Sequence, residues 1–331
     1  MSKLENRPVL MDIRGVKKWF PVKRGPLGST KNYVKAVDDI NLTIHQGDTL
    51  GLVGESGCGK STLARTILRL IEPTAGEVIF QGEDLVKLSP AQLRNVRRDV
   101  QIIFQDPYAS LNPRIKVKDI LAEPFLIHKI CGRQEALERA AKLVNMVGLN
   151  QDSLGKYPHE FSGGQRQRIC IARALAVEPK LVVCDECVSA LDVSIQAQII
   201  NLLMELQRKL DLTLVFISHD LRVVRHISSH VAVLYLGKIV EYAPKGELFA
   251  SPQHPYTQAL LSAMPIADPD AQRSRIHLEG DLPSPINQPS GCSFHTRCPM
   301  AREGCSVDAP ALVEITPGHF CRCPYTGQAA D

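Results

Sequence analysis

Alternating and continuous apolar stretches along the first 70 residues predict strands and one helix. Residues 9–20 (VLMDIRGVKKWF) alternate in the manner of a strand, and residues 36–56 (AVDDINLTIHQGDTLGLVGES) contain two more. The last of these is an almost unbroken apolar run, which suits a buried parallel strand. A glycine-rich turn follows it, and residues 60–71 then have helical periodicity. The apolar face of that helix contains Leu63, Ile67, Leu68 and Ile71.

Three later apolar stretches, each ending in a polar residue, extend the same pattern. They are DVQIIFQ (99–105), LVVCDE (181–186) and LTLVFISH (212–219), and helical patterns separate them. Strands that alternate with helices predict an α/β fold, in which active residues gather at the carboxyl ends of parallel strands.

The spacing of these elements also predicts how the chain is organised. A helix-rich block at about 107–180 interrupts the strands and is interpreted as an inserted helical subdomain. Near residue 244 the periodicity gives way to proline-marked segments such as SPQHPYTQALLSAMP, which indicate a C-terminal appendage. We therefore expect a main domain at 1–250 and an extension at 251–331.

Composition excludes several classes of protein. The 331 residues are 44% hydrophobic, with a net charge of +4 and scattered basic residues, so nucleic acid is not expected as a partner. No apolar run approaches the ~20 residues that cross a bilayer, and the first residues do not resemble a signal peptide. These features predict a cytoplasmic protein. Five of its 10 cysteines lie in the last 40 positions.

The stretch GESGCGKST (54–62) matches the phosphate-binding pattern G-x-x-x-x-G-K-[ST] between a predicted strand and a predicted helix. Glycines let successive backbone N–H groups face phosphates, Lys60 reaches the β and γ phosphates, and the Ser61 hydroxyl is a ligand for Mg²⁺. The loop predicts a nucleotide-phosphate site, and by itself it fits kinases, GTPases and many ATPases. Its nucleotide-binding residues are Gly54, Ser56, Gly57, Cys58, Gly59, Lys60, Ser61 and Thr62.

A second motif distinguishes among these classes of nucleotide-binding protein. FSGGQRQR (161–168) has a serine and two glycines that predict a helix-capping turn with exposed N–H groups. It closely resembles the signature sequence of ATP-binding cassette (ABC) proteins, with Phe161 in place of the usual leucine. The resemblance implies that Ser162, Gly163, Gly164 and Gln165 contact the γ-phosphate held by a second subunit in a head-to-tail dimer.

The remaining elements of that family follow in order. By resemblance, Gln105 is the glutamine that senses Mg²⁺, Asp185 holds Mg²⁺ through water, and Glu186 is the general base that positions the attacking water. Asp192 resembles the loop that crosses the dimer interface, and His219 the switch histidine at the γ-phosphate. Phe20 resembles the aromatic residue that stacks on adenine, with Trp19 as the alternative. An ABC-type ATPase with a mixed sheet core is therefore expected.

The whole chain resembles the ATP-binding subunits of dipeptide and oligopeptide importers. The most particular matches are FQDPYASLNPR after residue 103, HPYTQALLSAMP (254–265) and the cysteine-rich sequence beyond it. In that family the appendage holds a [4Fe–4S] cluster, which implies Cys292, Cys298, Cys305 and Cys323 as ligands. Cys321, where the family usually has an apolar residue, is an alternative ligand. Zinc on the same sulfurs is one alternative to iron, and an appendage with reduced cysteines and no metal is another.

The resemblance also implies partners and a location. Expected partners are a second homologous ATPase subunit, either a different chain or a second copy, two integral membrane permease subunits, and an extracytoplasmic substrate-binding protein. The chain would then lie peripherally on the cytoplasmic face of the plasma membrane. Peptides are the expected cargo; glutathione, a nickel chelate or an opine would leave the same residues here. A soluble regulatory ABC ATPase is the alternative from another class.

Cys184 and Cys187 form a C-x-x-C around Asp185 and Glu186. If the strand continues through Cys187, alternation would point the two thiols to opposite faces, a poor geometry for a metal clamp or a disulfide. We therefore interpret the spacing as accidental. Cys187 stands where the family usually has proline, and this change restores an N–H beside the expected catalytic base.

Overall fold

The structure is a computed structural model that describes residues 7–24, 30–264 and 276–326. The chain divides into two compact units, each built from separated segments. The first unit contains residues 1–8, 45–49 and 87–217, and the second contains residues 9–44, 50–86 and 218–331. This division differs from the linear one expected at residue 250, which stays a prediction.

The first unit contains three parallel strands at the expected positions. They are β6 (Val100–Ile103), β7 (Leu181–Asp185) and β8 (Thr213–Ile217), and β7 pairs in parallel with both neighbours. Every residue of β7 and β8 is buried, as expected for strands covered on both faces. The polar residues that end β7 therefore lie at a carboxyl edge of the sheet.

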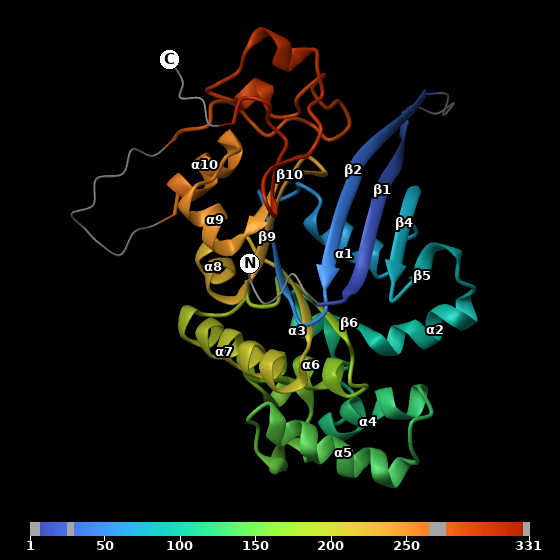
Figure 1. Cartoon of the computed structure of the whole chain (residues 1–331). Helices are drawn as coiled ribbons and strands as arrows, with labels where there is room; N and C mark the ends of the chain where they lie inside the picture. Colours follow the sequence, from blue (N-terminus) through green and yellow to red (C-terminus); the bar gives the residue numbers. More distant parts are fainter. Residues whose placement is uncertain (1–6, 25–29, 265–275, 327–331) are drawn as a thin grey trace, which may run out of the picture. The chain divides into compact units, whose positions relative to one another are not determined.

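Helices make up the rest of the first unit (Figure 1). Within residues 107–180 the structure has α helices and 3₁₀ turns and no strand. In α5 (Arg133–Met146), the buried residues Ala136, Ala140, Leu143 and Val144 recur at helical spacing on one face. The helices of this unit are α2 (Pro90–Asp99), α3 (Pro107–Ser110), α4 (Val117–Ile127), α5 (Arg133–Met146), α6 (Gly163–Leu175) and α7 (Val193–Leu210).

The second unit contains an antiparallel sheet in the order β2-β1-β4-β5. Its strands are β1 (Val9–Arg24), β2 (Thr30–His45), β4 (Ala75–Phe80) and β5 (Glu83–Asp84). The expected helix after the phosphate-binding pattern is α1 (Lys60–Ile67), which is shorter than predicted. It ends there because Leu68 is its C-cap and Arg69 has a left-handed φ of 49°, so Ile71 lies outside the helix.

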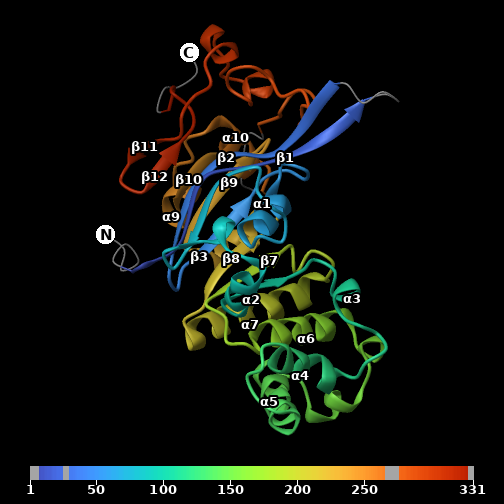
Figure 2. The same ribbon diagram turned by 90° about the vertical axis from the view of Figure 1, so that its right-hand side faces the viewer.

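A second group of strands in this unit mixes both directions. β3 (Thr49–Val53) pairs in parallel with β9 (His230–Tyr235), and β10 (Lys238–Pro244) is antiparallel to β9. The C-terminal segment adds β12 (His319–Cys321) to β10 and β11 (Val313–Thr316) to β12 (Figure 2). The expected mixed sheet is confirmed, and the extension contributes to it. The helices here also include α8 (Leu221–Ile227), α9 (Lys245–Ala250) and α10 (Pro255–Ser262).

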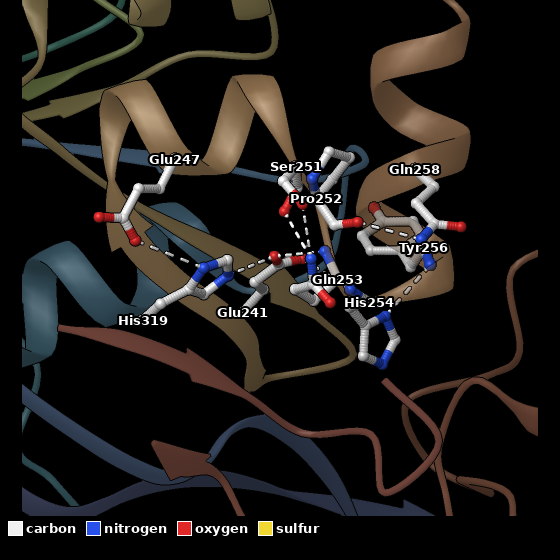
Figure 3. Close-up of polar contacts among 9 residues, drawn as sticks. All are labelled: Glu241, Glu247, Ser251, Pro252, Gln253, His254, Tyr256, Gln258 and His319. Carbon is white, nitrogen blue, oxygen red and sulfur yellow. Dashed lines mark hydrogen bonds and ion pairs between the residues drawn. The ribbon is translucent and has the colours of Figure 1, made fainter. Parts of the chain in front are cut away.

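One buried carboxylate joins the extension to β10 (Figure 3). Glu241 is fully buried and accepts hydrogen bonds from the backbone N–H groups of Gln253 at 2.7 Å and His254 at 2.9 Å. The Nε2 atom of His319 lies 2.8 Å from the same carboxylate. Nδ1 of His254 accepts from the N–H of Tyr256 at 3.1 Å and caps α10. A buried charge requires such partners, so these contacts set the start of α10 and the place of β12.

The burial of His254 makes stability depend on pH. Burial lowers the pKa of His254 from 6.5 to about 4. Between these values the unfolded chain binds a proton that the folded chain does not, so the free energy of unfolding falls as the pH drops. Between pH 7 and pH 5, protonation of His254 in the unfolded chain should lower the free energy of unfolding by about 2 kcal/mol. An asparagine at position 254 could still accept the N-cap hydrogen bond, but its side chain does not titrate.

Urea unfolding of the wild type and of His254→Asn at both pH values measures this contribution. Between pH 7 and pH 5, we expect the free energy of unfolding to fall by about 2 kcal/mol less in the variant than in the wild type. Equal losses in the two proteins would show that His254 titrates normally.

Candidate functional site

The phosphate-binding loop is tightly packed at two of its glycines. A Cβ on Gly54 would lie 2.2 Å from the carbonyl oxygen of Leu234, and one on Gly59 would lie 2.0 Å from that of Ala36. Gly59 also has a left-handed φ of 108° and is the N-cap of α1. Only glycine fits at these positions, and it lets backbone N–H groups at the start of α1 face an anion.

Lys60 is buried at 4% exposure, and its ammonium group lies inside the loop. Nζ donates to the carbonyl oxygens of Gly54 at 2.8 Å and Glu55 at 2.9 Å, and lies 3.8 Å from Sγ of Cys58. Ser56 and Gly57 are exposed, whereas Ser61 and Thr62 are half-buried in the first turn of α1. The expected nucleotide-binding residues of this loop are therefore brought together in the second unit.

His219 and the candidate adenine-stacking residues belong to the same unit. His219 is exposed just after β8, and the preceding Ser218 donates its N–H to the carbonyl oxygen of Leu52 at 3.3 Å. That contact joins the loop of His219 to the strand that leads into the phosphate-binding loop.

Trp19 and Phe20 lie side by side in β1, and both rings are half-buried. Nε1 of Trp19 donates to Asp38 at 3.2 Å, and the ammonium of Lys35 lies 5.0 Å from the ring centroid of Trp19. The ammonium of Lys18 lies 5.0 Å from the centroid of Phe20. Because both rings make contacts of this kind, the contacts do not distinguish Phe20 from Trp19. The choice of adenine-stacking residue therefore stays a prediction.

The first unit holds the expected carboxylates and Gln105. Asp185 ends β7 and is buried at 2% exposure. Glu186 follows with a left-handed φ of 48°, an uncommon conformation for a non-glycine residue. Nε2 of Gln105 donates to Oε2 of Glu186 at 3.1 Å. The structure thus brings Gln105 and the expected general base into direct contact.

The signature turn and Asp192 also lie together in the first unit. Ser162 caps α6, since its hydroxyl accepts from the N–H of Gln165 at 3.4 Å and its N–H donates to that side chain at 3.0 Å. A Cβ on Gly164 would lie 2.4 Å from Cγ2 of Ile195, and one on Gly163 would lie 3.3 Å from Leu191. Asp192 caps α7 by accepting from the N–H of Ile195 at 2.9 Å, a bond that lowers the pKa of Asp192.

The strand does not continue through Cys187, so the alternation that would place Cys184 and Cys187 on opposite faces does not apply. β7 ends at Asp185, and the left-handed Glu186 turns the chain before Cys187. Both cysteines are buried at 1% exposure or less. The hydrogen bond between their thiols and the burial of Cys187 raise its pKa well above the ordinary value. The thiols are therefore in contact, although both are reduced.

The four cysteines expected from the appendage line one cavity of about 360 Å³. Burial raises the pKa of Cys292 and Cys323, and raises that of Cys298 to about 11. Charge repulsion within the group, which includes Cys305, acts in the same direction. The thiols are therefore close enough to influence one another electrostatically.

Cys321 is fully buried and does not line this cavity. It lies within β12, opposite Glu241 of β10 and Val313 of β11. Among the described residues, no group of three or more His, Cys, Asp or Glu side chains is placed so that it could hold a metal ion. The four cysteines line one cavity without forming a metal site there.

Comparisons with known proteins agree on the family. The family model "ABC transporter" matches residues 37–189, and "Oligopeptide/dipeptide transporter, C-terminal region" matches residues 240–305. The oligopeptide transport ATP-binding protein AppF of Bacillus subtilis is 52% identical over 96% of this chain and 98% of its own length. The corresponding protein OppF of Escherichia coli is 52% identical over 93% of this chain and 94% of its own length.

A solved structure agrees with the fold. The ATP-binding cassette MJ0796, a dimer in a post-hydrolysis state with ADP and Pi, has a TM-score of 0.63 and is 29% identical. The match covers 71% of this chain and 99% of that one. Within the described part of our chain, no helix is both long and apolar enough to cross a membrane.

The burial of the loop cysteine and of the C-x-x-C predicts low thiol reactivity. The pKa of Cys58 is raised by burial, and that of Cys187 by Cys184 and by burial, so neither forms a thiolate readily near neutral pH. Cys131 is half-buried and serves as the internal reference. In the native protein we expect iodoacetamide to modify Cys131 at least about tenfold faster than Cys58 or Cys187.

Mass spectrometry of peptides after timed alkylation measures these rates, with urea-unfolded protein as the control for full accessibility. Rapid native modification of Cys187 would instead indicate a reactive thiol pair beside Glu186.

Proposed function

The chain belongs to the ABC transporter family, and we propose that it is the ATP-hydrolysing subunit of an importer of di- and oligopeptides. The observation that carries this proposal is the combination of two matched regions in one chain. The ABC transporter model matches residues 37–189, and the oligopeptide/dipeptide region matches residues 240–305. Relatives that are 52% identical over nearly their whole length are named oligopeptide transport ATP-binding proteins.

The role assigned to each residue follows from the atoms that it can offer to the phosphates or to Mg²⁺. Lys60 and the backbone N–H groups of its loop bind the phosphates. By resemblance to the family, Ser61 is assigned as a ligand for Mg²⁺, Gln105 as the residue that senses the ion, and Asp185 as the carboxylate that holds it through water; oxygen atoms of these kinds are the ligands that Mg²⁺ prefers. Bound Mg²⁺ would neutralise charge on the phosphates. Since Nε2 of Gln105 donates to Glu186, the amide oxygen Oε1 is the atom available as a ligand.

Glu186 is assigned as the general base that orients the attacking water. Its left-handed backbone and its contacts with Gln105 and Ser189 support this assignment. Phosphoryl transfer depends mainly on positioning and charge neutralisation, so a fixed carboxylate is sufficient. His219 is assigned to the γ-phosphate, and Phe20, with Trp19 as the alternative, to the adenine.

We propose that the signature turn acts on a second subunit. Ser162, Gly163, Gly164 and Gln165 begin α6, whose N-terminal N–H groups suit an anion. The dimeric cassette among the similar structures supports a dimer, and Asp192 would lie at its interface. By resemblance to importers that pair two different ATPase subunits, a different but homologous ATPase subunit is the proposed partner, with a homodimer as the alternative. This chain has both the lysine loop and the signature turn and would be the catalytically intact member of the pair.

Two membrane permease subunits and an extracytoplasmic binding protein complete the proposed importer. The chain would then lie peripherally on the cytoplasmic face of the membrane. The stretch after Gln105 is the proposed permease contact. Tyr108 at its start is 59% exposed, and the guanidinium of Arg166 lies 3.7 Å from its ring centroid, which presents a fixed aromatic surface. Glutathione, a nickel chelate or an opine is the alternative cargo.

Reconstitution of the full importer tests this function. We expect ATPase activity that rises with peptide-loaded binding protein, together with co-purification of the permeases. Glu186→Gln should assemble and bind ATP normally yet lose turnover by roughly 100-fold or more, the usual size of a general-base effect. Glu205→Gln is the matched control, because Glu205 lies on the exposed face of α7 in an ion pair with Lys209.

Normal hydrolysis by Glu186→Gln would remove the glutamate from its assigned role. Activity that is independent of permeases and binding protein would favour a soluble regulatory ATPase.

We propose that the extension holds a [4Fe–4S] cluster on Cys292, Cys298, Cys305 and Cys323. The support is that these four line one cavity while Cys321 does not. Four cysteine thiolates are the ligand set that such a cluster takes. Tetrahedral thiolates also suit zinc, which is the alternative.

Anaerobic purification distinguishes the two metals. We expect absorbance near 400 nm, about four iron atoms per chain, and loss of both in Cys298→Ser but not in the matched control Cys321→Ser. A colourless protein with one zinc would contradict the cluster, and retention of iron by Cys298→Ser would contradict the ligand set.

A further inference from the structure

The second residue of the phosphate-binding loop, Glu55, is held by the C-terminal extension. The guanidinium of Arg297 makes two contacts with its carboxylate, Nη1 to Oε2 at 2.9 Å and Nη2 to Oε1 at 3.2 Å. The side chain of Arg297 is 9% exposed and that of Glu55 is 27% exposed. A bidentate pair that is largely shielded from water has a defined geometry, which a lysine could not reproduce.

A second contact from the extension holds the backbone of the same residue. The N–H of Glu55 donates to the hydroxyl of Tyr256 at 2.9 Å. Tyr256 lies in α10 and is fully buried, and burial raises the pKa of its hydroxyl, which stays neutral. The side chain and the backbone of Glu55 are thus fixed by two different segments of the extension.

An aromatic cluster fixes the positions of those two segments relative to each other. The ring of Tyr256 lies 4.7 Å from that of Tyr235 and 5.4 Å from that of Phe294, between centroids. Tyr235 and Phe294 meet edge to face at 5.2 Å. All three rings are fully buried or nearly so. Because Phe294 lies three residues before Arg297, this packing limits where the guanidinium can lie.

The remaining polar group of Glu55 contacts the lysine of the loop. Its carbonyl oxygen accepts from Nζ of Lys60 at 2.9 Å. The extension therefore acts on the residue that Lys60 uses as a partner. We propose that Arg297 and Tyr256 are positioning residues for the phosphate-binding loop: they fix Glu55 and thereby the position of Lys60 for nucleotide. This inference rests on the proposed ATP-binding function.

Equilibrium binding of MgATP and MgADP to the full-length chain tests the proposal. In Arg297→Gln and Tyr256→Phe we expect the Kd for both nucleotides to rise about fivefold to tenfold, since the first loses the bidentate ion pair and the second loses one hydrogen bond that order the loop. Arg297→Lys keeps the charge without the fork and should lie between Arg297→Gln and the wild type. Arg302→Gln is the matched control: Arg302 lies in the same extension over the ring of Tyr325 and should bind like the wild type.

A double-mutant cycle with Glu55→Gln tests whether the effect of Arg297 on nucleotide binding depends on its ion pair with Glu55. If Arg297 acts through Glu55, Glu55→Gln combined with Arg297→Gln should bind no more weakly than either single variant. Additive losses would show that Arg297 acts elsewhere. Thermal unfolding of each variant is recorded in parallel. Wild-type affinity in Arg297→Gln and Tyr256→Phe, even with lowered Tm, would reduce both residues to structural roles and overturn the proposal.

The same measurements separate this inference from the proposed function. A wild-type chain that binds neither MgATP nor MgADP contradicts the function. A wild-type chain that binds both, with variants that bind equally well, contradicts only the positioning roles.

Discussion

Backbone packed against backbone determines the shape of the phosphate-binding loop. At Gly54 and Gly59 the neighbouring carbonyl groups of Leu234 and Ala36 leave no room for a side chain. The turn after β9 completes this contact, because Gly237 donates its N–H to the carbonyl oxygen of Cys58 at 2.8 Å. These contacts come from main chain that is already fixed by strands. The loop therefore has its conformation before any ligand arrives, and such preorganisation lowers the cost of binding.

Much of the fold could be predicted from the sequence because its buried strands are continuous apolar runs. β3, β7 and β8 lie where those runs lie, since a strand covered on both faces has apolar residues at nearly every position. β11 and β12 were not predicted. They are short, and three of the four residues of β11 are exposed, so neither has an apolar pattern that marks it as a strand. They form because the chain returns to the edge of β10, which is a long-range event.

The candidate site, like the fold, could be predicted from the sequence only in part. Local motifs predicted the phosphate-binding loop and the signature turn, because adjacent residues make both. The contact between Glu55 and Arg297 joins residues 242 positions apart, and no periodicity or motif marks it. The contact of Cys184 with Cys187 was missed for a different reason. It depends on the left-handed backbone of Glu186, and the sequence contains no glycine there to indicate one.

The buried carboxylate of Glu241 limits how freely this extension can be exchanged between related proteins. Its partners, the N–H groups of Gln253 and His254 and the ring of His319, all come from beyond residue 250. A shortened cassette that ends at residue 250 would expose this charge, together with the ring of Tyr235. A transplanted extension would need matching partners at Glu241 and Glu55. Glu241 lies inside the region that the oligopeptide/dipeptide family model matches, at residues 240–305, so that region contains both the buried carboxylate and two of its partners.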